Sequence, residues 1–193
     1  IITTASLFFI WTLFVLFFGS NDIVRTNKTV NNDSNSSAIF ETNKGLFTVD
    51  LTVPADYAGN HTQQELNETA EEFGYDSITL NVDGSITYKM TKRQHEELMD
   101  ETRKEINNQL QDMIGGEDYP SFTDIKANSD FTEFTVTTTS EDLNMTESMS
   151  IFVFYTYGGL YSAFSGKDID NIHVKYVNQN TGNVISEADS KDL

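Results

Sequence analysis

Residues 77–113 read SITLNVDGSITYKMTKRQHEELMDETRKEINNQLQDM, and their hydrophobic spacing changes part-way along. Residues 77–82 and 85–90 alternate apolar and polar side chains, which is the period of a half-buried strand. The dipeptide Asp83-Gly84 between them is a strong hairpin signal, since both turn positions favour positive φ. The first half of the stretch therefore predicts a β-hairpin.

The second half of the stretch predicts a helix over 91–114. Thr91 and Gln94 have the spacing of a capping box, and Gly115-Gly116 supplies the stop. One face recurs at three- and four-residue steps and is expected to be buried: His95, Leu98, Met99, Thr102, Ile106, Leu110 and Met113. A strand pair thus leads directly into an amphipathic helix.

The chain on both sides repeats these two kinds of element. Residues 46–54 alternate like a strand, and Thr62 and Glu65 form a second capping box that opens a helix ending at Gly74. Four further strands are predicted on the C-terminal side, at 122–127, 131–138, 172–177 and 184–188.

Residues 142–165, DLNMTESMSIFVFYTYGGLYSAFS, fit two descriptions. The central IFVFYTY has high β-propensity. We nevertheless predict a helix with Ser140 as its N-cap, and strand in part of it stays open. One helical face carries Met145, Met149, Phe152, Thr156, Gly159 or Leu160, and Ala163. Such a helix is apolar around most of its circumference, so it is either central or covered by a partner.

The order of elements predicts an α+β fold. We expect a mainly antiparallel sheet with about three helices packed on one face, because strands joined by short turns favour antiparallel pairing. Residues 45–193 are expected to form it as a single domain.

Residues 1–20 and 21–44 differ from this domain in composition. Fourteen of the first 18 residues are apolar and the first charge is Asp22, which suits a membrane-spanning helix or the apolar region of a secretory signal. Residues 21–44 are dominated by Asn, Ser, Thr and Asp, which predicts a flexible tether. We expect residues 1–18 to hold an extracytoplasmic domain at the cell membrane, and secretion after cleavage is the alternative.

Charge and cysteine content exclude several classes of protein. With 12 basic and 30 acidic residues, the net charge is −18. Nucleic-acid affinity comes largely from Lys and Arg on phosphates, so we expect no nucleic-acid partner. The absence of Cys rules out disulfides and thiolate metal sites.

No catalytic constellation is recognisable in the sequence. His61, His95 and His173 each lack a second His at metal-binding spacing, and phosphate-loop, dinucleotide-binding and nucleophile-elbow motifs are missing. We therefore leave catalytic residues unassigned, expect no cofactor, and favour a non-enzymatic role.

One loop carries the oxygen-rich residues that a hard cation prefers. Asp168, Asp170 and Asn171 could ligate Ca²⁺, although the loop lacks the glycine and distal Glu of an EF-hand. A solvated turn is the other interpretation. No further metal site is expected.

Six segments carry a resemblance: Val49–Pro54, Asp83–Tyr88, Glu117–Pro120, Phe131–Val136, Phe164–Lys167 and Asn171–Val174. Over about residues 46–193 the chain resembles uncharacterised exported proteins of clostridial-type Firmicutes, many of them predicted lipoproteins. The resemblance implies an extracytoplasmic bacterial origin and no known activity. Ser20 is a departure, because a lipoprotein would have its lipid-bearing Cys there.

Taken together, the sequence predicts a binding module for a protein or a cell-surface polymer. The alternative is a cell-envelope hydrolase whose acidic site is assembled across the fold. A third hypothesis is a subunit whose aromatic helix is covered in an oligomer.

Overall fold

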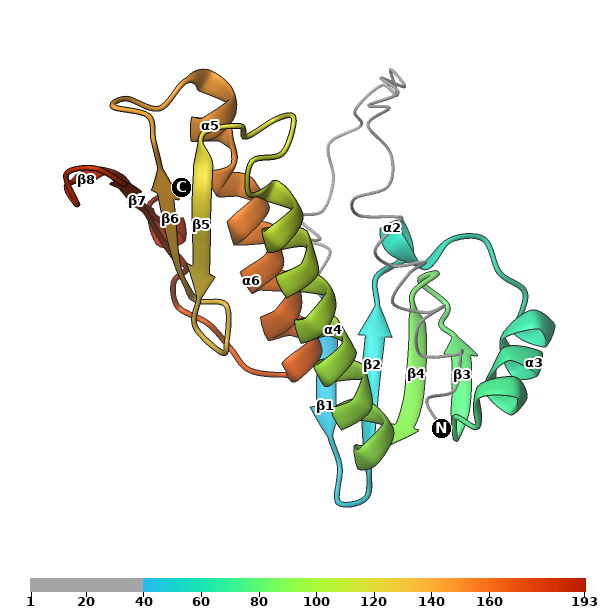
Figure 1. The fold of residues 1–193 in the computed structure, drawn as a ribbon. Helices are drawn as coiled ribbons and strands as arrows, with labels where there is room; N and C mark the ends of the chain where they lie inside the picture. Colours follow the sequence, from blue (N-terminus) through green and yellow to red (C-terminus); the bar gives the residue numbers. More distant parts are fainter. Residues whose placement is uncertain (1–39) are drawn as a thin grey trace. The chain divides into compact units, whose positions relative to one another are not determined.

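The computed structural model describes residues 40–193 (Figure 1). The predicted membrane segment and most of the predicted tether lie outside these residues. The fold is α+β, as predicted, but the strands form two four-stranded sheets rather than one. Contacts cluster into two compact units, one ending at Glu101 and the other running from Thr102 to Leu193, and helix α4 (Lys92–Met113) spans the boundary. The expected domain over 45–193 thus contains two separately packed units.

The first unit is a four-stranded antiparallel sheet in the order β1-β2-β4-β3. Its elements are β1 (Glu41–Lys44), β2 (Thr48–Val53), α2 (Ala55–Ala58), α3 (Gln63–Phe73), β3 (Ser77–Leu80) and β4 (Ile86–Thr91). Alternation along β2 buries Val49, Leu51 and Val53, as the sequence predicts, whereas Phe47 precedes the strand and is exposed.

Strand β1 corrects the predicted tether over 21–44. Glu41 to Lys44 pair antiparallel with the outer edge of β2, in a register that joins Thr42 to Leu51. The side chains of β1 are mostly exposed and polar, so its sequence resembles a linker. The pairing comes from backbone groups that composition does not reveal.

The β3–β4 turn corrects the prediction of positive φ at both Asp83 and Gly84. Gly84 has φ +86°, but within residues 40–193 Phe131 is the only non-glycine residue with positive φ. The turn is longer than two residues, since the Asn81 N–H donates to the Ser85 carbonyl at 2.8 Å. Asp83 accepts from the Ser85 N–H at 3.0 Å and from its hydroxyl at 2.7 Å, which stabilises this wider loop without a left-handed Asp.

Both predicted capping boxes are confirmed. The Thr62 N–H donates to the Glu65 carboxylate at 2.8 Å, and the Glu65 N–H donates back to the Thr62 hydroxyl at 3.3 Å. Thr91 and Gln94 repeat this geometry at the start of α4, at 2.9 and 3.3 Å. The seven residues predicted on the inner face of α4 are all buried.

The second unit has a mixed sheet in the order β5-β6-β7-β8. Its elements are β5 (Phe122–Ala127), β6 (Glu133–Thr138), α5 (Met145–Met149), α6 (Ile151–Ser165), β7 (His173–Asn178), β8 (Val184–Asp189) and a 3₁₀ turn over Ser190–Asp192. The outer pairs are antiparallel hairpins, while β6 and β7 are parallel because the helices between them carry the chain back across the sheet.

Residues 145–165 are helical, in agreement with the prediction, but the N-cap is Asn144 rather than Ser140. The Asn144 side chain accepts from the Glu147 N–H at 3.0 Å, and the Glu147 carboxylate accepts from the Asn144 N–H at 2.9 Å. The Ser140 hydroxyl instead donates to the Glu147 carboxylate at 3.0 Å. A side chain three residues before Glu147 can close this reciprocal pair, whereas Ser140 lies seven residues away.

Helix α6 lies against the second sheet (Figure 1), and aromatic side chains pack between the two. The Phe154 ring lies 5.0 Å from that of Phe134 on β6, and the Tyr161 ring lies 5.0 Å from that of Phe131. Between them Gly158 permits a close approach, since a Cβ at this position would lie 2.7 Å from Ile172 Cδ1 and clash with the Phe131 carbonyl. Gly158 thus serves close helix packing, whereas a Cβ at the neighbouring Gly159 would meet nothing within 4 Å.

Candidate functional site: an outward apolar row on α5 and α6

Helices α5 and α6 have two apolar faces, and the sheet covers one of them. The buried residues are Phe154, Tyr157, Gly158, Tyr161 and Phe164, together with Ser162 and Ser165. The face singled out from the sequence points the other way: Met145, Met149 and Phe152 are 84%, 54% and 46% exposed. We call these three residues the Met–Phe row. The second unit therefore covers only one apolar side of this segment.

The row stays continuous across the junction between the two helices. Ser150 links them with right-handed helical angles, so the spacing of four and then three residues keeps the row on one side. On the inner side the Ser150 hydroxyl lies 2.7 Å from the Tyr176 hydroxyl and 2.6 Å from the Glu147 carbonyl. Burial raises the pKa of Tyr176 to about 12, so its hydroxyl stays protonated at neutral pH. The hydrogen bond between Ser150 and Tyr176 therefore fixes the junction between α5 and α6.

Tyr155 extends the row toward β8. Its ring meets that of Phe152 edge-on at 6.5 Å. Its hydroxyl oxygen is buried and has no hydrogen-bond partner within residues 40–193. Burial raises the pKa of Tyr155, and the carboxylates of Asp189 and Asp192 raise it further. The end of the row thus carries a neutral hydroxyl close to two acids.

Asp189 is held by a small polar cluster on β7 and β8. The Asn171 amide donates to Asp189 Oδ1, and His173 Nδ1 lies 3.0 Å from the same oxygen. These two hydrogen bonds lower the pKa of Asp189, so it is charged at neutral pH. The second ring nitrogen, His173 Nε2, lies 3.9 Å from the Glu187 carboxylate. The row is therefore bordered by anchored negative charge.

Glu147 lies beneath the row and serves the fold. It is only 1% exposed and accepts hydrogen bonds from the Ser121 hydroxyl, the Ser140 hydroxyl and the Asn144 N–H. Burial raises its pKa, but these donors outweigh burial and leave the pKa below its usual value. A carboxylate saturated in this way anchors α5 rather than serving as an acid or base.

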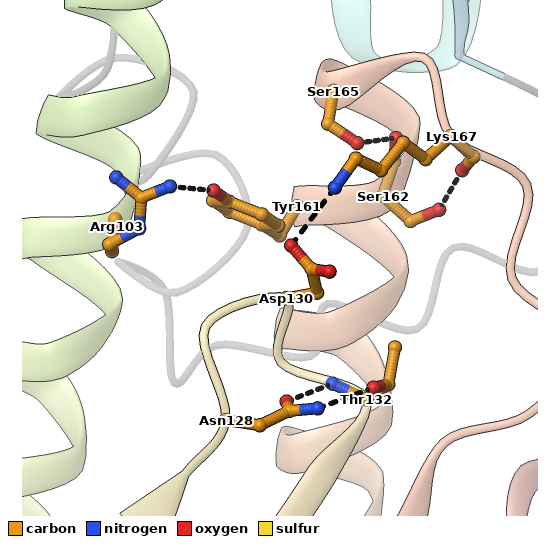
Figure 2. A network of polar contacts seen from close by, with 8 residues as sticks. All are labelled: Arg103, Asn128, Asp130, Thr132, Tyr161, Ser162, Ser165 and Lys167. Carbon is orange, nitrogen blue, oxygen red and sulfur yellow. Dashed lines mark hydrogen bonds and ion pairs between the residues drawn. The ribbon is translucent and has the colours of Figure 1, made fainter.

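A second network, shown in Figure 2, fixes the other end of α6. The Arg103 guanidinium donates to the Tyr161 hydroxyl, and Lys167 Nζ lies 3.1 Å from Asp130 Oδ1. Below them the Asn128 side chain closes the β5–β6 turn on Thr132 with two contacts of 2.8 Å. One end of α6 is thus tied to β7 and the other to α4 and the β5–β6 turn, which fixes the direction in which the row points.

That turn contains a strained residue. Phe131 has φ +54°, a conformation that costs a non-glycine residue about 1–3 kcal/mol. Its side chain is buried against Phe134 and Tyr161, which explains why a phenylalanine occupies a position that favours glycine.

The three calcium candidates have different surroundings. Asp168 and Asp170 are exposed, whereas Asn171 uses its amide for Asp189 and accepts from the Lys191 N–H at 3.2 Å. Across residues 40–193 no group of three or more His, Asp or Glu side chains could hold a metal ion.

The three histidines lie in different settings. His61 is exposed, His95 is buried in α4, and His173 is half-buried beside Asp189. Sequence reasoning missed the His173–Asp189 pair, although the signal was present. In the predicted hairpin of 172–177 and 184–188, antiparallel register places these two residues opposite each other.

The second unit also has a polar groove of about 420 Å³ beside the β7–β8 turn. Glu141 and Asp142 line it, together with amide and hydroxyl groups from Asn180, Thr181 and Asn183. Asn178, which also lines it, is occupied by the Ser140 carbonyl and by the N–H groups of the turn. The groove is thus acidic, and its most buried side chain is already used structurally.

No protein-family model, curated protein or solved structure matches the chain. The resemblance to exported Firmicutes proteins stays a prediction. Within the described part of the chain, no helix combines the length and hydropathy needed to cross a membrane.

Proposed function

We propose that the protein is an extracytoplasmic interaction module that binds a protein or cell-surface polymer through the Met–Phe row. Residues 1–18 would hold it at the cell membrane, or it would be secreted after cleavage. The observation that carries the proposal is the exposure of Met145, Met149 and Phe152 in a line on one helix face.

The row differs from ordinary exposed apolar residues. Single exposed hydrophobic side chains are common and need no explanation, whereas an adjacent group on one element is typical of a binding surface. Methionine side chains are flexible and polarisable, so they adapt to partners of different shape. Covering the row would bury apolar area that contributes about 25 cal/mol per Å².

Site-specific photo-cross-linking tests this role. A photoreactive amino acid replaces Met149 in the full chain, expressed in the cells that normally make it. The matched control carries it at Thr123, which is exposed on β5 at the opposite edge of the sheet from β8. The proposal expects a discrete adduct from position 149 and none from position 123. Equal or absent labelling at both positions would reject the row as a binding surface.

Membrane attachment needs a separate experiment. Carbonate extraction of membranes should leave the full-length protein in the pellet if residues 1–18 span the bilayer. Full-length protein in the supernatant would contradict that model, and a shortened secreted form would support cleavage.

A hydrolase is the second candidate, and the acidic groove favours it. Glu141 and Asp142 are two neighbouring carboxylates that line a cavity, and carboxylates are among the side chains that serve as general acids and bases. Replacing them with Gln and Asn should abolish envelope-polymer hydrolysis if the groove is catalytic. Undiminished hydrolysis by that double variant, or none by the wild-type chain, would remove the groove as an active site.

A further inference from the structure

The length of the Met–Phe row suits one helix of a partner. Phe152 lies seven residues after Met145, which is about two helical turns and about 10 Å at 1.5 Å per residue. An amphipathic helix presents anchors at the same spacing of three and four residues, so it can place a matching apolar stripe along the row.

The negative charge around the row favours a partner helix with positive charge. Residues 102–193 contain 15 acidic and 6 basic residues. Asp189 and Asp192 lie near enough to Tyr155 to raise the pKa of its hydroxyl, and Asp142 precedes Met145 by three residues. A basic partner gains attraction from this border, whereas an acidic partner is repelled.

Phe152 supplies a further place for a cationic side chain. The hydroxyl oxygen of Tyr155 is buried, so a cation of the partner would meet the exposed ring of Phe152 rather than this oxygen. The adjacent rings of Phe152 and Tyr155 can attract the same cation through their faces.

We infer, building on the function proposed above, that the occupant of the Met–Phe row is a basic amphipathic helix of a partner protein. Its apolar stripe would cover Met145, Met149 and Phe152, and its Lys or Arg residues would face Asp142, Asp189 and Asp192. A second copy of this chain is disfavoured, because a symmetric contact would bring two copies of the same acidic border together. An anionic bilayer would be repelled by the same charges.

The test uses the full chain, held in phosphatidylcholine nanodiscs. The protein has no Cys, so Thr146→Cys introduces a single thiol next to the row for an environment-sensitive fluorophore. The probe is an 18-residue helical peptide built from Leu on one face and Lys on the other. A peptide with Glu in place of Lys is the charge control, and a Leu/Lys peptide of scrambled order is the amphipathicity control.

We expect the Leu/Lys helix to bind saturably, with an affinity that falls as salt is added, and neither control peptide to bind. Met149→Ser with Phe152→Ser should weaken binding of the Leu/Lys helix about tenfold or more through lost apolar burial. Asp142→Asn with Asp192→Asn should weaken it about threefold and flatten its salt dependence. Circular dichroism checks that each variant remains folded.

Several outcomes would overturn the inference. Equal binding of the Leu/Glu peptide, or of the scrambled peptide, would remove the charge or the helix argument. A fluorescence change with phosphatidylglycerol vesicles but not with peptide would assign the row to a membrane. Faster disulfide dimer formation by Met149→Cys than by Thr123→Cys would assign it to a second copy. A discrete adduct at position 149 together with no peptide binding would reject the basic helix and leave the interaction module standing.

Discussion

The two units follow the same order of elements but connect their hairpins differently. Each runs strand, strand, helix, strand, strand. In the first unit, the second strand of the later hairpin, β4, pairs with β2, and the connection is antiparallel. In the second unit, the first strand of the later hairpin, β7, pairs with β6, and the connection is parallel. The difference lies in the position of the strand that follows each crossover helix: β3 is at the edge of its sheet, whereas β7 is central.

Strand β3, which follows helix α3, lies at the edge of the first sheet, and α3 hydrogen-bonds to this strand. The Gln63 amide donates to the Ile78 carbonyl at 2.8 Å and accepts from the Leu80 N–H at 2.8 Å. One side chain thus takes the place of a neighbouring strand on that edge. Because only Leu66 and Ala70 of α3 are buried, this helix contributes little apolar surface.

Helix α6 behaves in the opposite way. It is apolar around most of its circumference, buries its aromatic face on the second sheet, and leaves β7 central. Its remaining apolar surface, continued by α5, becomes the Met–Phe row. In this molecule the crossover helix with the larger apolar surface is the one that covers its sheet, and it leaves part of that surface exposed.

Gly158→Val tests the close packing of α6 and, with the buried control Phe154→Ser below, has one of the two largest expected effects. The new side chain would meet Ile172 and the Phe131 carbonyl, so the free energy of unfolding should fall by about 3 kcal/mol. Urea denaturation measures it. Gly159→Ala is the control, since a Cβ there meets nothing within 4 Å, and it should stabilise α6 by up to about 1 kcal/mol. Similar losses at both positions would mean that Gly158 is not a packing requirement.

Glu147→Gln should change how the stability of the second unit depends on pH and leave that of the first unit unchanged. The lowered pKa means that ionised Glu147 stabilises the second unit above the ordinary value of 4.5, and that this contribution disappears as pH falls through the lowered pKa. The substitution should lower the free energy of unfolding of the second unit by about 2 kcal/mol at neutral pH. It should also reduce the further loss of stability when the pH is lowered. Amide hydrogen exchange of Val136 in the second unit and Leu51 in the first reports each unit separately. Glu117→Gln, an exposed control, should change neither, and an unaltered pH profile for Glu147→Gln would contradict the assignment.

Gln63→Ala should affect the first unit alone. Loss of both contacts to β3 should cost about 1 kcal/mol, because water can replace the amide at this partly exposed edge. The Leu80 N–H should exchange faster, whereas Gln64→Ala, which removes only an exposed contact to Glu68, should leave it unchanged. An unchanged Leu80 rate in Gln63→Ala would show that α3 does not protect the edge.

The smallest effect on stability is expected at the row itself. Met149→Ser should change the free energy of unfolding by less than about 0.5 kcal/mol, because the side chain is largely exposed. Phe154→Ser, on the buried face of the same helix, should cost about 3–5 kcal/mol. Thermal or urea unfolding of the pair compares the two faces directly. A large loss from Met149→Ser would mean that the row belongs to the core.

Local elements were predictable wherever neighbouring residues decide them. The Thr62 and Thr91 capping boxes, the inner face of α4 and the later hairpins depend on spacing within a few residues of sequence. Strand β1 was missed because its pairing uses backbone groups, and the turn at Asp83 was misassigned because Ser85 supplies donors that favour a wider loop. The candidate site was half predictable: the helical face containing Met145, Met149 and Phe152 was visible, but not its exposure.

The sequence by itself determined the amphipathic periods, the caps, the acidic charge and the excess of apolar residues in 142–165, because each depends on residue type and spacing alone. Tertiary structure decided that the strands form two sheets, that β7 rather than β8 joins β6, and which side of α5 and α6 remains uncovered. The physical reason is that a helix apolar on most sides can pack in more than one orientation. The sheet selects one of them: Gly158 allows the closest approach, Phe131 and Phe134 receive the aromatic rings, and the Met–Phe row is left outward.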